Sequence, residues 1–135
     1  MIFDVSFCKI ILIQMNKKDL ETRLINFAVL IVQIVETMQQ TKAANHLSGQ
    51  LLRSGTSPAL NYGEAQSGES RRDFIHKIKI VLKELRESNI CMKIIYNTKL
   101  YEKEEPIQLA LNESNELIAI FVQSVATAQK NNLNL

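Results

Sequence analysis

The sequence predicts an all-α protein whose architecture is an antiparallel, up-down-up-down four-helix bundle. Apolar residues recur at intervals of three and four in four long segments, which is the spacing of helices that bury one face. The chain has only 4 glycines and 2 prolines, too few for the many tight turns of an all-β fold. The breaks between the segments are short, so consecutive helices are expected to run antiparallel.

The first helix is expected over residues 17–41 and the second over residues 47–66. Pro58 lies inside the second pattern, where a proline removes a backbone donor, and it predicts a kink. A small-residue edge that another helix can approach is expected at three positions spaced by seven: Gly49, Thr56 and Gly63. The apolar positions that define the two core faces are Leu20, Leu24, Phe27, Ile31, Ile34, Val35 and Met38, then Leu47, Leu51, Pro58, Tyr62 and Ala65.

The third helix is expected over residues 70–98, and the fourth from Pro106 to a frayed end near Lys130. Ser70, with an acidic Asp73 three residues later, is typical of a helix N-cap. The core positions of these two helices are Phe74, Ile78, Val81, Leu82, Leu85, Met92 and Tyr96, then Ile107, Leu111, Ile118, Phe121 and Val125.

The bundle is expected to occupy residues 15–130, as one domain between two segments that do not contribute to it. We interpret residues 1–14 as an N-terminal extension, either a mis-start upstream of Met15 or a loose tail. This apolar stretch is too short to cross a membrane and lacks the features of a signal peptide, so no membrane association is expected. Residues 131–135 are expected to form a disordered tail.

The composition is that of an ordinary globular protein, with 46% hydrophobic and 22% charged residues, and it argues against disorder. The net charge of +2 is too small to indicate a nucleic-acid partner by itself. The two cysteines, Cys8 and Cys91, lie far apart and fit no metal-ligand spacing. A reduced, cytoplasmic location is therefore expected.

Some apolar residues lie away from the expected core faces. On the first helix, Ile25, Val29 and Val32 form a second stripe; on the third, the positions off the core face are Ile80, Cys91, Ile94 and Ile95. A helix that is apolar on two sides is usually buried on two sides, and a four-helix monomer has one interior. We therefore expect a homo-oligomer whose contacts include Ile25, Val29, Val32 and Ile80. The alternative is a scatter of surface apolar residues, which is normal when they occur singly.

A polar stripe follows one side of the second helix and consists of Gln50, Arg53, Ser54, Ser57, Asn61 and Glu64. The facing stripe on the third helix is mixed in charge and consists of Asp73, Lys77, Glu84 and Glu87. An antiparallel hairpin brings Arg53 level with Glu84, a pair of opposite charge. The other levels expected are Glu64 with Asp73 and Asn61 with Lys77. Two interpretations stay open: a solvated face of little energetic weight, or a hydrogen-bonded network that fixes helix register or lines a subunit interface.

The third helix also carries a basic row, whose members follow one edge at helical spacing: Arg72, His76, Lys79, Lys83 and Arg86, with Arg71 beside them. Such a row can follow the phosphates of a nucleic acid, with possible contacts at Arg71, Arg72, Lys79, Lys83 and Arg86. The alternative is an ordinary solvated face. No aromatic residue interrupts the row, so stacking of bases is not expected.

Catalytic motifs are not apparent. Ser54 and Ser57 offer hydroxyls, but neither His46 nor His76 stands at the spacing of a known nucleophile motif. The paired Glu-x-x-His motifs of di-iron bundles and a glycine-rich phosphate loop are also missing from the sequence. We therefore expect no enzymatic activity, no cofactor, no metal and no small-molecule substrate.

The span from Leu47 to Ile95 contains a specific pattern: Gln50-Leu51-Leu52-Arg53-Ser54, then Ser57, Asn61 and Glu64-Ala65, then Asp73-Phe74 and Lys83-Glu84-Leu85. In these residues the chain closely resembles the four helix bundle protein family, which is linked to proteins encoded by intervening sequences in bacterial large-subunit ribosomal RNA genes. The motif covers the second and third helices. The first and fourth helices match in pattern only.

The resemblance implies a cytoplasmic four-helix bundle that assembles as a ring-like homopentamer. It also implies kinship with the accessory proteins of diversity-generating retroelements, which are pentameric and bind RNA and a reverse transcriptase. The family's characteristic residues fall on the polar stripe, which favours a network or interface role for Arg53, Asn61, Glu64 and Glu84. The expected function is that of an interaction or scaffold protein; the alternative is an RNA-binding accessory protein that uses the basic row.

Overall fold

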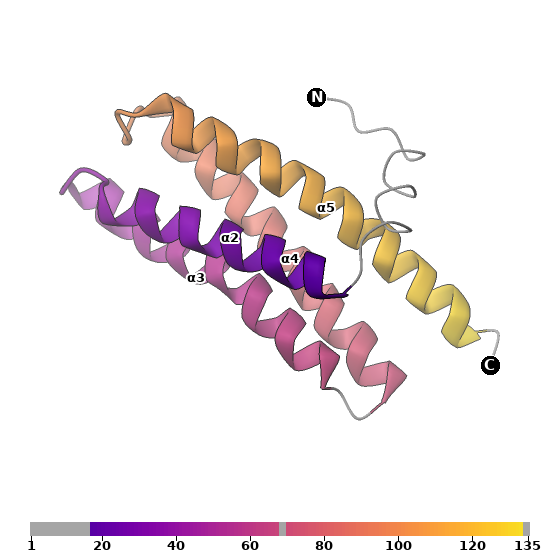
Figure 1. Ribbon diagram of the computed structural model, residues 1–135. Helices are drawn as coiled ribbons and strands as arrows, with labels where there is room; N and C mark the ends of the chain where they lie inside the picture. The colour runs from indigo at the N-terminus through magenta and orange to yellow at the C-terminus, as the bar shows by residue number, and fades with distance from the viewer. Residues whose placement is uncertain (1–16, 68–69, 134–135) are drawn as a thin grey trace.

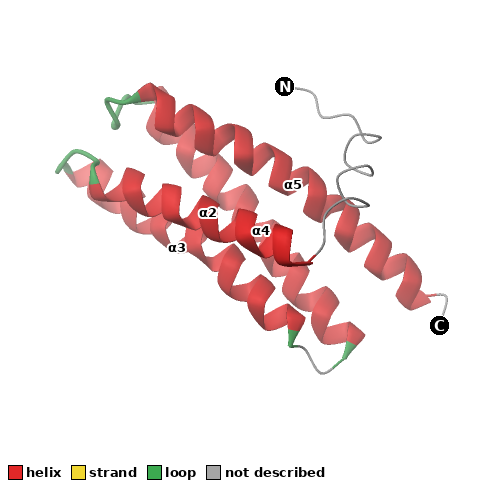
Figure 2. Ribbon diagram, viewed as in Figure 1, coloured by secondary structure: helices red, strands yellow, loops and turns green. Residues whose placement is uncertain are grey.

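The structure is a computed structural model that describes residues 17–67 and 70–133. In this part of the chain the regular elements are four helices: α2 (Lys17–Glu36), α3 (Lys42–Gln66), α4 (Arg71–Asn97) and α5 (Glu104–Leu133). They lie side by side, and short loops join α2 to α3 and α4 to α5 (Figure 1, Figure 2). The predicted all-α, four-helix fold is confirmed. The extension expected at residues 1–14 lies outside the described residues.

The break between the first two helices lies about five residues earlier in the sequence than expected, because a side chain at its end caps the second helix. α2 ends at Glu36 rather than at residue 41, and α3 begins at Lys42 rather than at residue 47. The Thr41 hydroxyl accepts a hydrogen bond from the Ala44 N–H at 3.1 Å and so satisfies one of the free donors of the first turn. The polar residues after Thr41 are therefore helical rather than a loop.

The last two helices follow the expected limits more closely. Ser70 caps α4 as predicted, and its hydroxyl accepts a hydrogen bond from the Asp73 N–H at 3.1 Å. α5 starts at Glu104, before Pro106, and continues to Leu133. It is therefore longer at both ends than the sequence pattern indicated, and residues 134–135 lie outside the described part.

Each helix packs against two others, because α2 and α4 both contact α3 and α5. The packing of α3 on α4 is the most extensive and that of α2 on α5 the least. Near one end of the bundle the Cys91 thiol lies 3.5 Å from the Leu47 carbonyl oxygen, and near the other Lys77 reaches Glu64. Late residues of α4 thus meet early residues of α3, so these two helices are antiparallel.

The predicted apolar stripes supply the core, whose largest fully buried side chains include Leu24, Phe27, Ile31, Ile34, Leu51, Ile78, Leu85, Met92 and Phe121. The prediction that Cys91 and Ile95 lie off the core was wrong, because both are buried. α4 packs between α3 and α5, so its buried face is wider than the single stripe on which the prediction depended. Ile80, expected at the same outer side, is half-buried.

The close approach of two helices occurs at Gly55 and not at the predicted small-residue edge. A Cβ added at Gly55 would lie 2.7 Å from Cγ2 of Ile31, whereas one added at Gly49 or Gly63 would meet nothing within 4 Å. Gly55 therefore lets α3 lie against the side chain of a residue in α2. The other two glycines leave open space on the outside of the bundle.

Candidate functional site

The polar stripe of α3 meets α4 along a line of paired side chains. Arg53 donates through Nη1 to Oε2 of Glu84 at 2.8 Å, the pairing that the helical register predicted. Its Nη2 donates to Glu87, so one guanidinium bridges two carboxylates a turn apart. Lys77 pairs with Glu64 at 2.5 Å rather than with Asn61, so this part of the predicted register was wrong by about one turn.

The remaining members of the predicted polar set have more local partners. Asn61 donates to the Ser57 hydroxyl at 2.8 Å within α3, and Asp73 contributes its backbone N–H to the cap of α4. Gln50 is exposed. At the centre of the α3–α4 contact, the buried Ser88 hydroxyl donates to the Ser54 hydroxyl at 3.1 Å. Small hydroxyl side chains thus occupy the buried part of the contact between α3 and α4.

The two carboxylates that share Arg53 differ in their surroundings. Glu84 is buried, and this loss of solvent raises the pKa of its carboxyl; the adjacent Glu87 carboxyl adds to the rise, while Arg53 opposes it. Glu87 is exposed, and its hydrogen bond from Arg53 lowers the pKa of its carboxyl. The buried member of the pair is therefore the one whose ionised form is disfavoured by folding.

We expect Glu84→Gln to raise the stability of the protein at neutral pH. A carboxyl whose pKa is raised by folding binds more protons in the folded than in the unfolded chain between the two pKa values, so stability falls as pH rises through that window. Glutamine does not ionise, so it removes this loss of stability while keeping the size and shape of the side chain. Arg53 keeps its hydrogen bond to Glu87. The free energy of unfolding, measured with denaturant at several pH values from acidic to neutral, should increase for the variant relative to the wild type as the pH rises. An equal difference at every pH would contradict this assignment.

The basic row lies on the outside of α4. Its members that the sequence singled out for nucleic-acid contact are all exposed, and in the described part of the chain none of them forms an ion pair: Arg71, Arg72, Lys79, Lys83 and Arg86. At intervals of three and four the row continues along the helix into exposed apolar residues, Ile90 at 56% and Ile94 at 44% exposure. Ile94 was predicted to lie off the core, but neither residue was expected to continue the basic row.

An open apolar groove of about 470 Å³ separates α2 from α3 on the outer surface. Its walls are Ile25, Ala28, Val29, Val32 and Gln33 of α2 with Thr56, Ala59 and Leu60 of α3. Ile25 and Val29 are 47% and 49% exposed, and Leu60 is 68% exposed. The second apolar stripe predicted for the first helix is thus present and uncovered. Leu60 was not predicted to belong to it, because its partners are on another helix.

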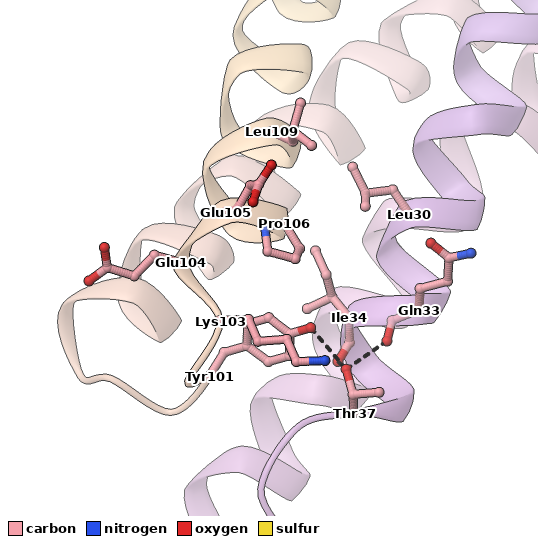
Figure 3. Close-up of a pocket in the computed structure, with 10 residues that line it drawn as sticks. All are labelled: Leu30, Gln33, Ile34, Thr37, Tyr101, Lys103, Glu104, Glu105, Pro106 and Leu109. Atoms are coloured by element: carbon pink, nitrogen blue, oxygen red, sulfur yellow. Dashed lines mark hydrogen bonds between the residues drawn. The ribbon is translucent and has the colours of Figure 1, made fainter.

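A second hollow, of about 600 Å³, lies where the end of α2 meets the α4–α5 loop and the start of α5 (Figure 3). The hydroxyls of Thr37 and Tyr101 share a hydrogen bond of 2.9 Å inside it. Leu30 and Leu109 form its apolar side, and Lys103, Glu104 and Glu105 line its polar side. Sequence patterns gave no signal for this hollow, because it brings together segments more than sixty residues apart.

Further along the contact line between α2 and α5, which we call the α2–α5 seam, ion pairs join the two helices. Arg23 donates to both carboxylate oxygens of Glu113, through Nε at 3.1 Å and through Nη2, and its Nη2 lies 3.7 Å from Glu116. Glu113 and Glu116 are one turn apart on α5, so a single guanidinium from α2 holds both. This pairing was not predicted from the sequence.

The hydroxyls considered for catalysis have no acid or base beside them among their hydrogen bonds in the described residues. Ser54 interacts with the Leu51 carbonyl and with Ser88, and Ser57 accepts from Asn61. In the same part of the chain no group of three His, Cys, Asp or Glu residues is placed to hold a metal ion. None of the helices described is long and apolar enough to span a membrane.

Comparison with known proteins identifies a matching protein family and similar solved structures. The family model described as 23S rRNA-intervening sequence protein matches residues 18–123. A crystal structure of a protein of unknown function from the S23 ribosomal protein family of Bacteroides thetaiotaomicron is similar to this chain, with 29% sequence identity and a TM-score of 0.75. The similarity covers 83% of this chain and 99% of that one. No curated protein matches the sequence.

Proposed function

We propose, because this chain belongs to the 23S rRNA-intervening sequence protein family, that it is a non-catalytic bundle that acts as a homo-oligomeric interaction or scaffold protein. The observation that carries the proposal is the uncovered apolar groove between α2 and α3. A stoichiometry of five is proposed from the family resemblance, and the cytoplasm is proposed because the family is described in relation to 23S rRNA.

The groove supports self-association for energetic reasons. Ile25 and Val29 are about half exposed and Leu60 is about two-thirds exposed, and covering each of them is worth about 1 kcal/mol. Contiguous apolar side chains on the surface of a small protein are typical of an interaction site. Association itself costs at least about 4 kcal/mol, so the groove needs contacts from a further surface to hold two copies together.

The test is a substitution in the middle of the groove. Val29→Asp places a charge among apolar walls and is expected to convert the assembly to a species of 15.4 kDa, with helical circular dichroism unchanged. Gln108→Glu makes the same change of charge at an exposed site of α5 and should keep the wild-type mass. Sedimentation equilibrium of the three proteins measures both outcomes. A wild type that sediments only as a 15.4 kDa monomer would overturn the proposal.

A second candidate function is RNA binding, favoured by the exposed basic row of α4. From Arg72 to Arg86 the row spans about 21 Å, at 1.5 Å per residue, and the nearest acidic residues do not neutralise it by ion pairs within the described part of the chain. Titration of mixed RNA binding against salt should give a log-log slope of about −0.7 for each phosphate contacted in a single strand. A slope near zero, or no binding at low salt, removes this candidate.

A further inference from the structure

We propose that the outward ridge of α4, formed by Arg86, Ile90, Lys93 and Ile94, docks into the α2–α3 groove of a second copy of the chain. This inference rests on the proposed self-association and identifies the further surface that the groove needs in order to hold two copies together. The contact joins two different faces, so each copy offers a ridge to one neighbour and a groove to another.

The ridge is an apolar pair with one cation before it and a second cation beside it. Ile90 and Ile94 are one turn apart, about 6 Å along the helix, and both are about half exposed. Arg86 lies one turn before Ile90, and Lys93 lies three residues after it, so positive charge stands on both sides of the first isoleucine. All four residues are exposed on the surface of their own bundle.

The groove has the opposite pattern of charge. On α2 its apolar residues run from Ile25 to Val32, about 10 Å along the helix, which is enough to receive a pair of isoleucines 6 Å apart. Glu21 lies one turn before Ile25, and Glu36 lies one turn after Val32. Both carboxylates are exposed, and neither forms an ion pair in the described part of the chain.

These charges favour a ridge in the groove over two grooves face to face. A symmetric contact between grooves brings the carboxylates at the ends of one groove near those of the other, and like charges across an interface are unfavourable. A ridge in the groove, with Ile90 and Ile94 over the middle of the apolar run, places Arg86 about 9 Å from the centre of the contact along the helix. The two carboxylates at the ends of the groove lie about 11 Å from that centre, so Arg86 comes near one of them. The apolar residues and one charged end then match together.

The two faces also lie on different sides of the bundle. α2 and α4 do not pack on each other among the described helices, because α3 and α5 stand between them. One copy can therefore use its ridge and its groove at the same time. A contact of this head-to-tail kind generates closed rings or open chains rather than a symmetric dimer.

The experiment combines two variants, each of which disables one face. Val29→Asp damages the groove and keeps the ridge, and Ile90→Asp damages the ridge and keeps the groove. Each alone is expected to sediment at 15.4 kDa with unchanged helical circular dichroism. An equimolar mixture retains one intact contact, so it should form a 1:1 complex of 2 × 15.4 = 30.8 kDa and no larger species.

Gln108→Glu again serves as the control that keeps full assembly. If Ile90→Asp assembles like the wild type while Val29→Asp does not, the groove has another occupant and this inference fails, although the proposed self-association stands. A mixture that stays monomeric across a dilution series also overturns it. A wild type that is itself monomeric refutes both proposals, so the two failures are distinguishable. Loss of RNA binding by Ile90→Asp without any loss of assembly would assign the ridge to nucleic acid instead.

Discussion

Replacing Gly55 with alanine is expected to lower the free energy of unfolding by about 1–3 kcal/mol, because the core at this point has no room for a methyl group. The new Cβ would lie 2.7 Å from Cγ2, 2.8 Å from Cγ1 and 3.0 Å from Cβ of Ile31. Ile31 is fully buried and β-branched, so its side chain cannot rotate away without displacing other core residues. The helices must therefore move apart where they are packed most closely.

Gly49→Ala is the matched control for this prediction. Gly49 lies in the same helix, and its added Cβ would meet nothing within 4 Å. Alanine has the higher helix propensity, so this variant should gain up to about 1 kcal/mol. Urea unfolding at one fixed protein concentration compares the two, since stability of an oligomer depends on concentration. A gain in both variants would show that the α2–α3 contact is looser than the structure has it.

Phe121→Ala is expected to have one of the largest effects of a single truncation among the described residues, a loss of about 3–5 kcal/mol in the free energy of unfolding. Phe121 is fully buried, and its ring meets Tyr62 edge to face, with centroids 5.6 Å apart and planes at 84°. The two rings come from α3 and α5, which stand diagonally across the bundle and whose backbones do not approach each other closely in the described residues. Alanine therefore removes both core volume and the contact that crosses the centre.

The neighbouring Val122 supplies the control for the aromatic substitution. It is exposed on the other side of α5, and Val122→Ala should change the free energy of unfolding by no more than about 0.5 kcal/mol. Thermal unfolding of both variants, with the same protein concentration, measures the difference. Similar losses in the two variants would mean that the ring of Phe121 is not part of a tightly packed centre.

The positions of the core residues were predictable because they follow a local rule. Leu24, Phe27 and Ile31 recur every three or four residues, and this period needs no knowledge of the partner helices. The special role of Gly55 was not predictable in the same way. Nothing near it in the sequence distinguishes it from Gly49, and only the position of Ile31 on another helix decides which glycine is crowded.

The same distinction, between features that follow a local rule and features that depend on another helix, applies to the candidate site. The pairing of Arg53 with Glu84 followed from placing α3 and α4 antiparallel, but the register estimated from the turn was not accurate enough to assign the partner of Lys77. Only one wall of the groove could be predicted, because its α2 residues form an apolar stripe in the sequence whereas Leu60 belongs to α3. Contacts of α2 with α5, the first and last helices described, were missed because no spacing rule relates segments so far apart.

The limited packing of α2 on α5 gives the bundle a preferred place to open. Arg23 joins the two helices in the first half of α2, and the Thr37–Tyr101 hydroxyl pair joins the residue just after the end of α2 to the α4–α5 loop. The more extensive α3–α4 contact has hydroxyl, charge and apolar contacts along its length. Transient separation of this kind is governed by the amount of buried apolar contact. Backbone amides of α2 should therefore take up deuterium sooner than those of α4, and native-state fluctuations would begin with the separation of α2 from α5.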